Sequence, residues 1–137
     1  TGTICGLRTD TKPEEIYQAI LEGMAFQFLL GYEQSRKIGA SIQKLICTGG
    51  GSKSDVTMQM RADIMNVEVS TITTGESGTL GCMILAAVGT GAYRNVEEAI
   101  GKAVHIKKTF EPNPVRQEYY RKKYERYKKL YELMHLF

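Results

Sequence analysis

The residues of this sequence best suited to chemistry are three consecutive glycines, Gly49, Gly50 and Gly51, which lie between a predicted strand and a predicted helix. Because glycine lacks a Cβ atom, the backbone N–H groups of such a bend can lie directly against a ligand. The start of a helix adds unpaired N–H donors and roughly half a positive charge. Both features suit a phosphate group. The same residues would also serve a tight strand-to-helix turn that binds nothing.

Two common phosphate-binding motifs fit this segment poorly. A Walker A loop needs a glycine directly before its lysine, but Ser52 precedes Lys53 here. The dinucleotide motif G-x-G-x-x-G would place Ser54 at its third glycine, and Glu68 lies too near the start of its strand to bind a ribose. A third type is the nucleotide loop of actin-like ATPases, in which two or three glycines and a small residue join an apolar strand to a helix. The segment fits this third type best.

The apolar periodicity and the turn residues predict strands and helices that alternate around this bend. The predicted strands cover residues 2–7, 42–48 and 67–72. The predicted helices cover residues 12–37, a segment ending at 65, and residues 79–88, 96–104 and 115–135. Thr11 is expected to cap the first helix, and Ser52 or Ser54 the second. The helix over 79–88 is apolar or small on nearly every side, which predicts that it is buried. The alternation favours an α/β fold with a mostly parallel sheet flanked by helices.

Composition and charge exclude several classes of protein. The chain has 137 residues, 42% of them apolar, which suits one folded domain rather than a disordered segment. Its net charge of +3 does not by itself indicate a nucleic-acid or membrane partner. The longest apolar run, residues 82–88, is too short to span a bilayer. Since the chain opens on Thr1 rather than methionine, we expect a piece of a longer polypeptide.

The cysteines and histidines indicate no metal site. Cys5, Cys47 and Cys82 are widely spaced among apolar neighbours, so we expect buried free thiols in a reducing, cytoplasmic compartment. His105 and His135 have no second ligand at helical spacing.

Three motifs in order make the sequence resemble the C-terminal domain of the FGGY family of carbohydrate kinases. The family's signature strand and the helix after it are matched by Gly2, Ile4, Gly6, Leu7, Glu15, Ile16, Ala19, Ile20, Leu21 and Glu22. Its nucleotide loop and the following helix are matched by residues 49–54 and by Gln59, Met60, Arg61, Ala62 and Asp63. Its next helix is matched by Glu76, Leu80, Gly81 and Cys82. The resemblance covers nearly the whole chain.

The resemblance implies that residues 1–137 are part of the C-terminal, nucleotide-binding domain of a two-domain sugar kinase. The implied fold is ribonuclease H-like, of the actin-like ATPase type, and incomplete at its N-terminal side. The implied partner is the N-terminal kinase domain of the same polypeptide, with ATP and Mg²⁺ held between the domains. An incomplete sheet leaves an edge unpaired and invites association, a homodimer being one form of it.

The resemblance also implies the roles of single residues. The nucleotide-binding residues would be Gly49, Gly50, Gly51, Ser52, Ser54 and Asp55. The backbone of Gly50 and Gly51 would lie near the α-phosphate and ribose, and Ser54 and Asp55 would border the adenine. The family's catalytic aspartate belongs upstream of Thr1, as do most sugar contacts. The chain alone is therefore expected to lack turnover, and a xylulose-like sugar or polyol is the favoured substrate.

A second hypothesis rests on the predicted final helix. Four tyrosines, Tyr120, Tyr124, Tyr127 and Tyr131, form one stripe among many basic residues. Such a helix could stack bases and neutralise phosphates as a nucleic-acid-binding module. The simpler interpretation is that the tyrosines pack on the body of the domain with their hydroxyls in water, while Glu118–Lys122 and Glu125–Lys129 pairs stabilise the outer face.

Two charged residues near the glycine bend are also open to two interpretations. Lys53 could meet a phosphate, or it could be a solvated lysine. Asp63 could touch a ligand, but a structural contact at a helix end is the preferred interpretation.

Overall fold

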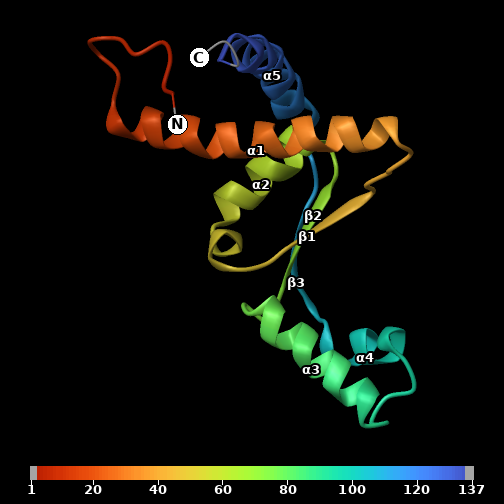
Figure 1. The fold of residues 1–137 in the computed structure, drawn as a ribbon. Coiled ribbons are helices and arrows are strands. Elements are labelled where there is room, and N and C mark those ends of the chain that lie inside the picture. Colours follow the sequence, from red (N-terminus) through yellow and green to blue (C-terminus); the bar gives the residue numbers. More distant parts are fainter. Residues whose placement is uncertain (1–2, 135–137) are drawn as a thin grey trace.

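The computed structural model of the chain describes residues 3–134. In chain order the elements are α1 (Pro13–Lys37), β1 (Lys44–Cys47), η1 (Gly50–Lys53), α2 (Asp55–Met65), β2 (Glu68–Ile72), α3 (Ser77–Gly89), α4 (Val96–Ala103), β3 (Ile106–Phe110) and α5 (Pro114–Met134). Helices α1, α2 and α5 pack together at one end of the strands, and α3 and α4 lie together at the other end (Figure 1).

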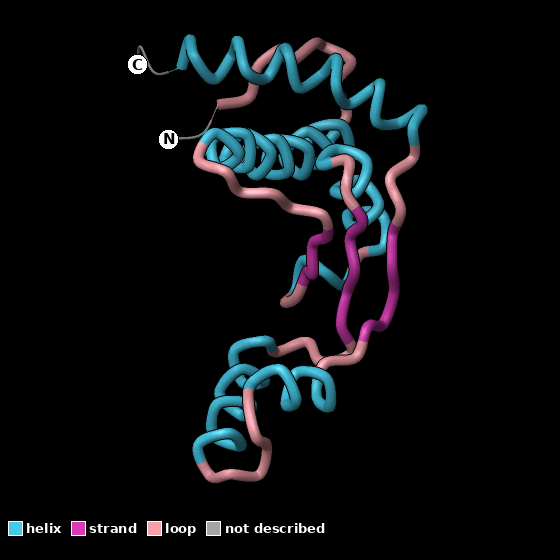
Figure 2. The backbone as a smooth tube through the Cα atoms, turned by 90° about the vertical axis from the view of Figure 1, so that its right-hand side faces the viewer, coloured by secondary structure: helices cyan, strands magenta, loops and turns pink. Residues whose placement is uncertain are grey.

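The sheet has three strands in the order β1-β2-β3, with β1 and β2 parallel and β2 and β3 antiparallel. The prediction of a mostly parallel sheet is therefore wrong: the sheet is mixed. The difference comes from β3, which the sequence pattern did not predict because four of its five residues are exposed and two are lysines. The α3–α4 pair lies beyond the carboxyl end of β2, so the chain re-enters the sheet from that end and runs antiparallel (Figure 2).

The strand predicted over residues 2–7 is also not found within the described residues 3–7. A strand needs a hydrogen-bonding neighbour, and no described strand lies beside this segment. The outer edge of β1 is likewise unpaired by any described strand.

Helix α1 spans Pro13–Lys37, in agreement with the prediction, but its cap differs from the expected one. The N-cap is Lys12, whose N–H donates to the Glu15 carboxylate at 2.8 Å. The hydroxyl of Thr11 instead accepts the N–H of Arg8 at 2.8 Å, in the turn before the helix. The Pro13 ring and the early acids still place the start correctly, since both suit a first helical turn.

Two clusters of buried side chains hold the fold. The first joins α1, α2 and α5 and contains Ala25, Phe26, Met60, Ile64 and Tyr124. The second lies between α2 and the sheet and contains Met58, Ala62, Val69 and Phe110. Because α2 contributes to both clusters, the helix that follows the glycine bend is fixed from two sides.

Helix α3 is exposed on much of its surface, which contradicts the prediction that it is buried. Only Ile84 is buried, whereas Met83 is 44% and Leu85 65% exposed. The apolar sequence favours a covering surface, and among the described elements α4 packs against α3 but leaves much of it exposed. The expectation for the thiols fails similarly: Cys5 and Cys82 are exposed and Cys47 is half-buried, although all three are free.

An ion pair between a half-buried lysine and a buried carboxylate ties α5 to α1. The carboxylate of Glu22, which is buried, accepts hydrogen bonds from Lys123 Nζ at 2.7 and 3.0 Å and from Gln18 at 2.8 Å. Since a buried charge is costly without a partner, this pair fixes the position of α5 on α1.

Replacing Lys123 with methionine should therefore destabilise the chain. The change leaves Glu22 without its cation, and we expect a loss of about 1–3 kcal/mol in the free energy of unfolding, measured by urea denaturation. The double variant Glu22→Gln/Lys123→Met should recover part of the loss because it buries no charge. Lys122→Met, on the exposed face, is the control and should change stability by less than about 0.5 kcal/mol. A Lys123→Met variant as stable as the parent would contradict this role.

Candidate functional site

The glycine bend has the form that the sequence predicts. β1 ends at Cys47, and Gly49 reverses the chain with φ +81°, a left-handed conformation that glycine adopts at little cost. The Gly49 carbonyl accepts the N–H and the hydroxyl of Ser52 at 3.1 and 2.8 Å. Of the two candidate caps, Ser54 caps α2, because its hydroxyl accepts the N–H of Thr57 at 3.3 Å.

The bend is open rather than filled by side chains. A Cβ atom placed on Gly49, Gly50 or Gly51 would meet no other atom within 4 Å, and Gly50 and Gly51 are exposed. These two residues open the 3₁₀ turn η1, and the i→i+3 pattern of such a turn leaves its first N–H groups without an acceptor inside it. Free donors and empty space therefore coincide at this position.

A second loop lies beside the bend. Because β1 and β2 are parallel, their carboxyl ends meet at one edge of the sheet, and residues 73–76 leave β2 there to start α3. The hydroxyl of Thr48 donates to the hydroxyl of Ser77 at 2.9 Å, which links the two loops. Ligands of open α/β sheets bind outside the carboxyl ends of the strands, so this edge is the place to expect one. No local sequence pattern indicates this link, because Thr48 and Ser77 are far apart in the chain.

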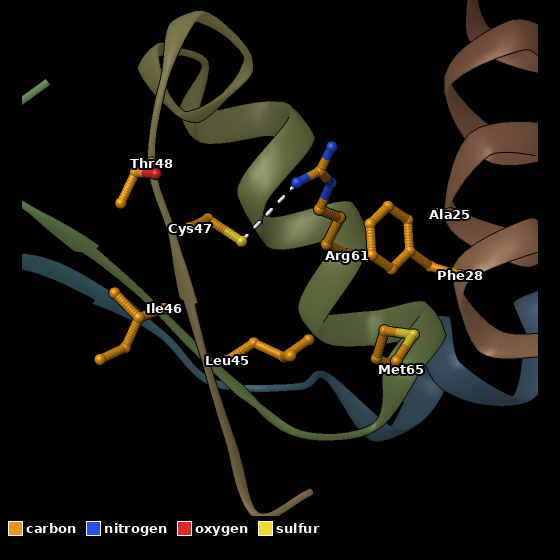
Figure 3. Close-up of a pocket in the computed structure, with 8 residues that line it drawn as sticks. All are labelled: Ala25, Phe28, Leu45, Ile46, Cys47, Thr48, Arg61 and Met65. Carbon is orange, nitrogen blue, oxygen red and sulfur yellow. Dashed lines mark hydrogen bonds between the residues drawn. The ribbon is translucent and has the colours of Figure 1, made fainter. Parts of the chain in front are cut away.

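An apolar cavity of about 210 Å³ lies between α1, β1 and α2, next to the bend (Figure 3). Its lining includes Leu45, Thr48 and Met65. Arg61 Nη1 donates to the Sγ atom of Cys47 at 3.6 Å, and its guanidinium lies 5.9 Å from the ring centre of Phe28. The cavity presents one cation but no carboxylate or imidazole, so its lining residues offer no acid–base pair. Within residues 3–134, no group of three or more His, Cys, Asp or Glu side chains gathers to hold a metal ion.

Asp55, the first residue of α2, is exposed and forms an ion pair with Lys108 of β3. Lys108 was not among the residues that sequence reasoning singled out, because the strand that carries it was not predicted. Lys53 is exposed at the end of η1, a position that suits a solvated lysine and also leaves the side chain accessible to a phosphate.

Asp63 has a structural position. It is fully buried, and its Oδ1 atom accepts the Gln59 side chain at 2.9 Å and the N–H of Asn113 at 2.8 Å. Its Oδ2 atom lies 3.8 Å from Arg116 Nη1. These contacts join α2 to the segment just before α5, in agreement with the preferred interpretation. His105 is exposed, and its carbonyl accepts the N–H of Thr73 at 3.0 Å; His135 lies outside the described residues.

The tyrosine stripe of α5 packs on the body of the domain. The ring of Phe26 lies 5.7 Å from that of Tyr124 and 5.5 Å from that of Tyr127, centre to centre. The hydroxyls were expected to face water, but two of them bind protein acceptors instead. Tyr124 donates to Glu33 at 2.9 Å and Tyr127 to Gln27 at 2.7 Å. Burial and the bond to Glu33 raise the pKa of Tyr124 above its ordinary value. Rings held in this way are not available to stack on bases.

Many of the basic residues of α5 are engaged within the chain. Glu118 pairs with Lys122 at 3.4 Å, as expected, and also with Arg121 at 2.8 Å, a hydrogen bond that lowers the pKa of Glu118 to about 2. The second expected pair is wrong, because Glu125 pairs with Lys128 rather than Lys129. These pairs leave less positive charge for a nucleic acid than the sequence suggests.

None of the helices in residues 3–134 combines the length and the apolar character needed to cross a bilayer.

Comparison with known proteins gives a consistent result. The model of the FGGY family of carbohydrate kinases, C-terminal domain, matches residues 1–90. The ribulokinase of Bacillus licheniformis is 35% identical over 137 residues, which is 96% of this chain and 25% of that protein. The L-xylulose/3-keto-L-gulonate kinase of Escherichia coli K12 is 33% identical over 130 residues, 95% of this chain and 26% of that protein. The chain thus spans about a quarter of the length of these relatives.

Solved structures show the same likeness. A ligand-bound xylulose kinase from Lactobacillus acidophilus has a TM-score of 0.85 at 28% identity, covering 96% of this chain and 27% of that chain. A gluconate kinase from the same organism has a TM-score of 0.84 at 28% identity, covering the same shares.

Proposed function

This chain belongs to the C-terminal domain of the FGGY family of carbohydrate kinases, and we propose that it is the ATP-binding part of a sugar kinase. The complete protein would transfer the γ-phosphate of ATP to a hydroxyl of a sugar or polyol. The proposal includes the ribonuclease H-like, actin-type fold, with the N-terminal domain of the same polypeptide on the other side of the cleft. It also places the catalytic aspartate in that other part, so that this chain alone would not turn over.

One observation carries the proposal: the bend at the carboxyl edge of the sheet offers free N–H groups in open space at the start of a helix. We expect the phosphates of ATP to lie against these N–H groups, because no side chain lies within 4 Å of the Cβ positions of the three glycines. In this assignment Gly50 and Gly51 lie near the α-phosphate and ribose, with Gly49 and Ser52 shaping the turn. Ser54 and Asp55 border the adenine.

Phosphoryl transfer depends mainly on positioning and on neutralising charge. In the proposed enzyme the bend holds and orients the nucleotide, while Ser54 fixes the start of α2 beside it. The Mg²⁺ ion supplies positive charge to the phosphates when it is bound. Since residues 3–134 present no cluster of three candidate ligands, we assign no residue of this chain to the metal.

The proposed substrate is a sugar of the xylulose type. The relatives and neighbours named above are a ribulokinase, an L-xylulose/3-keto-L-gulonate kinase, a xylulose kinase and a gluconate kinase, so most carry the name of a five-carbon ketose. The groups that bind the sugar would lie mostly outside this chain. A cytoplasmic location follows from the proposed metabolic role and agrees with three free thiols.

Hydrogen–deuterium exchange of the full-length protein tests the proposal. Addition of Mg-ATP should slow exchange in residues 49–55 and leave the outer face of α5 unchanged, because bound phosphate and base would cover the exposed amides of the bend. The competing module hypothesis predicts the reverse: a single-stranded oligonucleotide would protect residues 116–129, and added salt would weaken that protection. Exchange in residues 49–55 that ATP does not alter would overturn the nucleotide assignment.

A further inference from the structure

The ion pair between Asp55 and Lys108 joins two elements that are distant in sequence. Asp55 is the first residue of α2 and lies just after the glycine bend, whereas Lys108 is the third residue of β3. Lys108 Nζ donates to the Oδ2 atom of Asp55. Both side chains are more than half exposed, so the pair lies at the surface next to the bend.

Lys108 also contacts an aromatic ring of its own strand. Its ammonium group lies 5.1 Å from the ring centre of Phe110, a residue that is only 5% exposed and belongs to the core cluster under α2. A cation over an aromatic face is attracted to it, and the lysine stem covers apolar surface. The position of Nζ is thus set by the sheet, and the carboxylate of Asp55 is oriented by a group outside its own helix.

The pair leaves one oxygen of Asp55 available. Lys108 binds Oδ2, and no hydrogen bond from any residue in 3–134 reaches Oδ1. A carboxylate oxygen only accepts hydrogen bonds. It would therefore accept from the amino group at C6 of adenine and repel the carbonyl oxygen that guanine carries at the same position.

From this geometry we propose that Lys108 is a positioning residue that aims Oδ1 of Asp55 at the 6-amino group of the nucleotide base and so favours ATP over GTP. This inference rests on the proposed nucleotide site. An aspartate in the first turn of α2 would also stabilise the helix through its dipole. That purely structural role predicts no difference between ATP and GTP, which separates the two explanations.

The test measures the Kd of Mg-ATP and of Mg-GTP for the full-length protein by titration calorimetry. Lys108→Met should weaken ATP binding about two- to fivefold and leave GTP binding nearly unchanged, as expected from the strength of an exposed ion pair. Lys108→Arg should restore the preference. Lys107→Met is the matched control, because it removes the neighbouring lysine of β3, which forms no ion pair with Asp55 among the described residues. High salt should lower the ATP preference of the parent protein towards that of Lys108→Met, because salt screens exposed ion pairs.

A double-mutant cycle shows whether Lys108 acts through Asp55. Asp55→Ala should reduce the ATP preference about tenfold, and adding Lys108→Met to it should change nothing further. Equal effects of Lys108→Met and Lys107→Met on ATP binding would overturn the inference, and so would additive effects in the double variant. In either case, a loss of ATP preference in Asp55→Ala alone would still support the nucleotide site. A parent protein that binds neither nucleotide is a different result, because it overturns the proposed function itself.

Discussion

Replacing Gly50 with valine in the full-length protein should raise the KM for ATP at least tenfold and leave the KM for the sugar unchanged. The added side chain would occupy space that the nucleotide needs in the proposed site. A tenfold loss corresponds to about 1.4 kcal/mol, which is modest for a branched side chain placed in a ligand's position.

The fold should tolerate this change. A Cβ atom at Gly50 meets no protein atom within 4 Å, and the φ angle of Gly50 is not positive. Gly49 is a poorer choice because its φ of +81° would strain any other residue, so that lost binding would be confused with lost stability.

Gly31 on α1 provides the matched control for Gly50→Val. It also has open space at its Cβ position and no positive φ, and it lies away from the bend. Gly31→Val should therefore leave the KM for ATP unchanged. If Gly50→Val folds normally and binds ATP as well as the parent does, the assignment of the bend is wrong.

Replacing Tyr124 with alanine should cost about 3–5 kcal/mol of stability, the usual range for removing a large buried ring. Tyr124 is 4% exposed and packs against Phe26 and Tyr127 at the contact between α1 and α5. Denaturant unfolding measures the loss. Activity per folded molecule should stay close to that of the parent, because the residue lies far from the bend. Tyr119→Ala, at a position that is 52% exposed, should lose less than about 1 kcal/mol.

The phenylalanine variant at position 124 isolates the hydroxyl group. It keeps the ring but loses the hydrogen bond to Glu33, so we expect a loss of about 1 kcal/mol near neutral pH. Because burial and Glu33 raise the pKa of Tyr124 in the folded state, its hydroxyl contributes stability below the ordinary pKa of about 10 and loses it as the pH rises further. Tyr124→Phe should lack this alkaline loss. A parent protein and variant with the same stability at every pH would show that the hydrogen bond contributes nothing.

The prediction for α5 also decides between the two function hypotheses. If the tyrosines served a nucleic acid, Tyr124→Ala would leave stability intact and abolish binding. The packing of Tyr124 and Tyr127 on Phe26 instead makes them part of the core, which leaves the glycine bend as the chain's best candidate for chemistry.

Local features of the sequence determined the elements around the site. The proline and acids at the start of α1, the glycines after β1 and the hydroxyl of Ser54 act on residues within one turn of themselves, so their effects can be predicted without knowing the rest of the fold. The order and spacing of the motifs also sufficed for the family resemblance, which the comparison confirms.

Only the tertiary structure decided which surfaces are covered and which distant groups meet. Helix α3 and the three cysteines were expected to be buried, but burial depends on the surface that packs above a residue, which its own sequence does not specify. β3 was missed because its exposed lysines hide the strand pattern, and its place beside β2 depends on the α3–α4 pair that returns the chain. The link between Asp55 and Lys108 is a contact of this long-range kind. It exists because α2 and an edge strand are packed on the same core, and no local pattern could have predicted it.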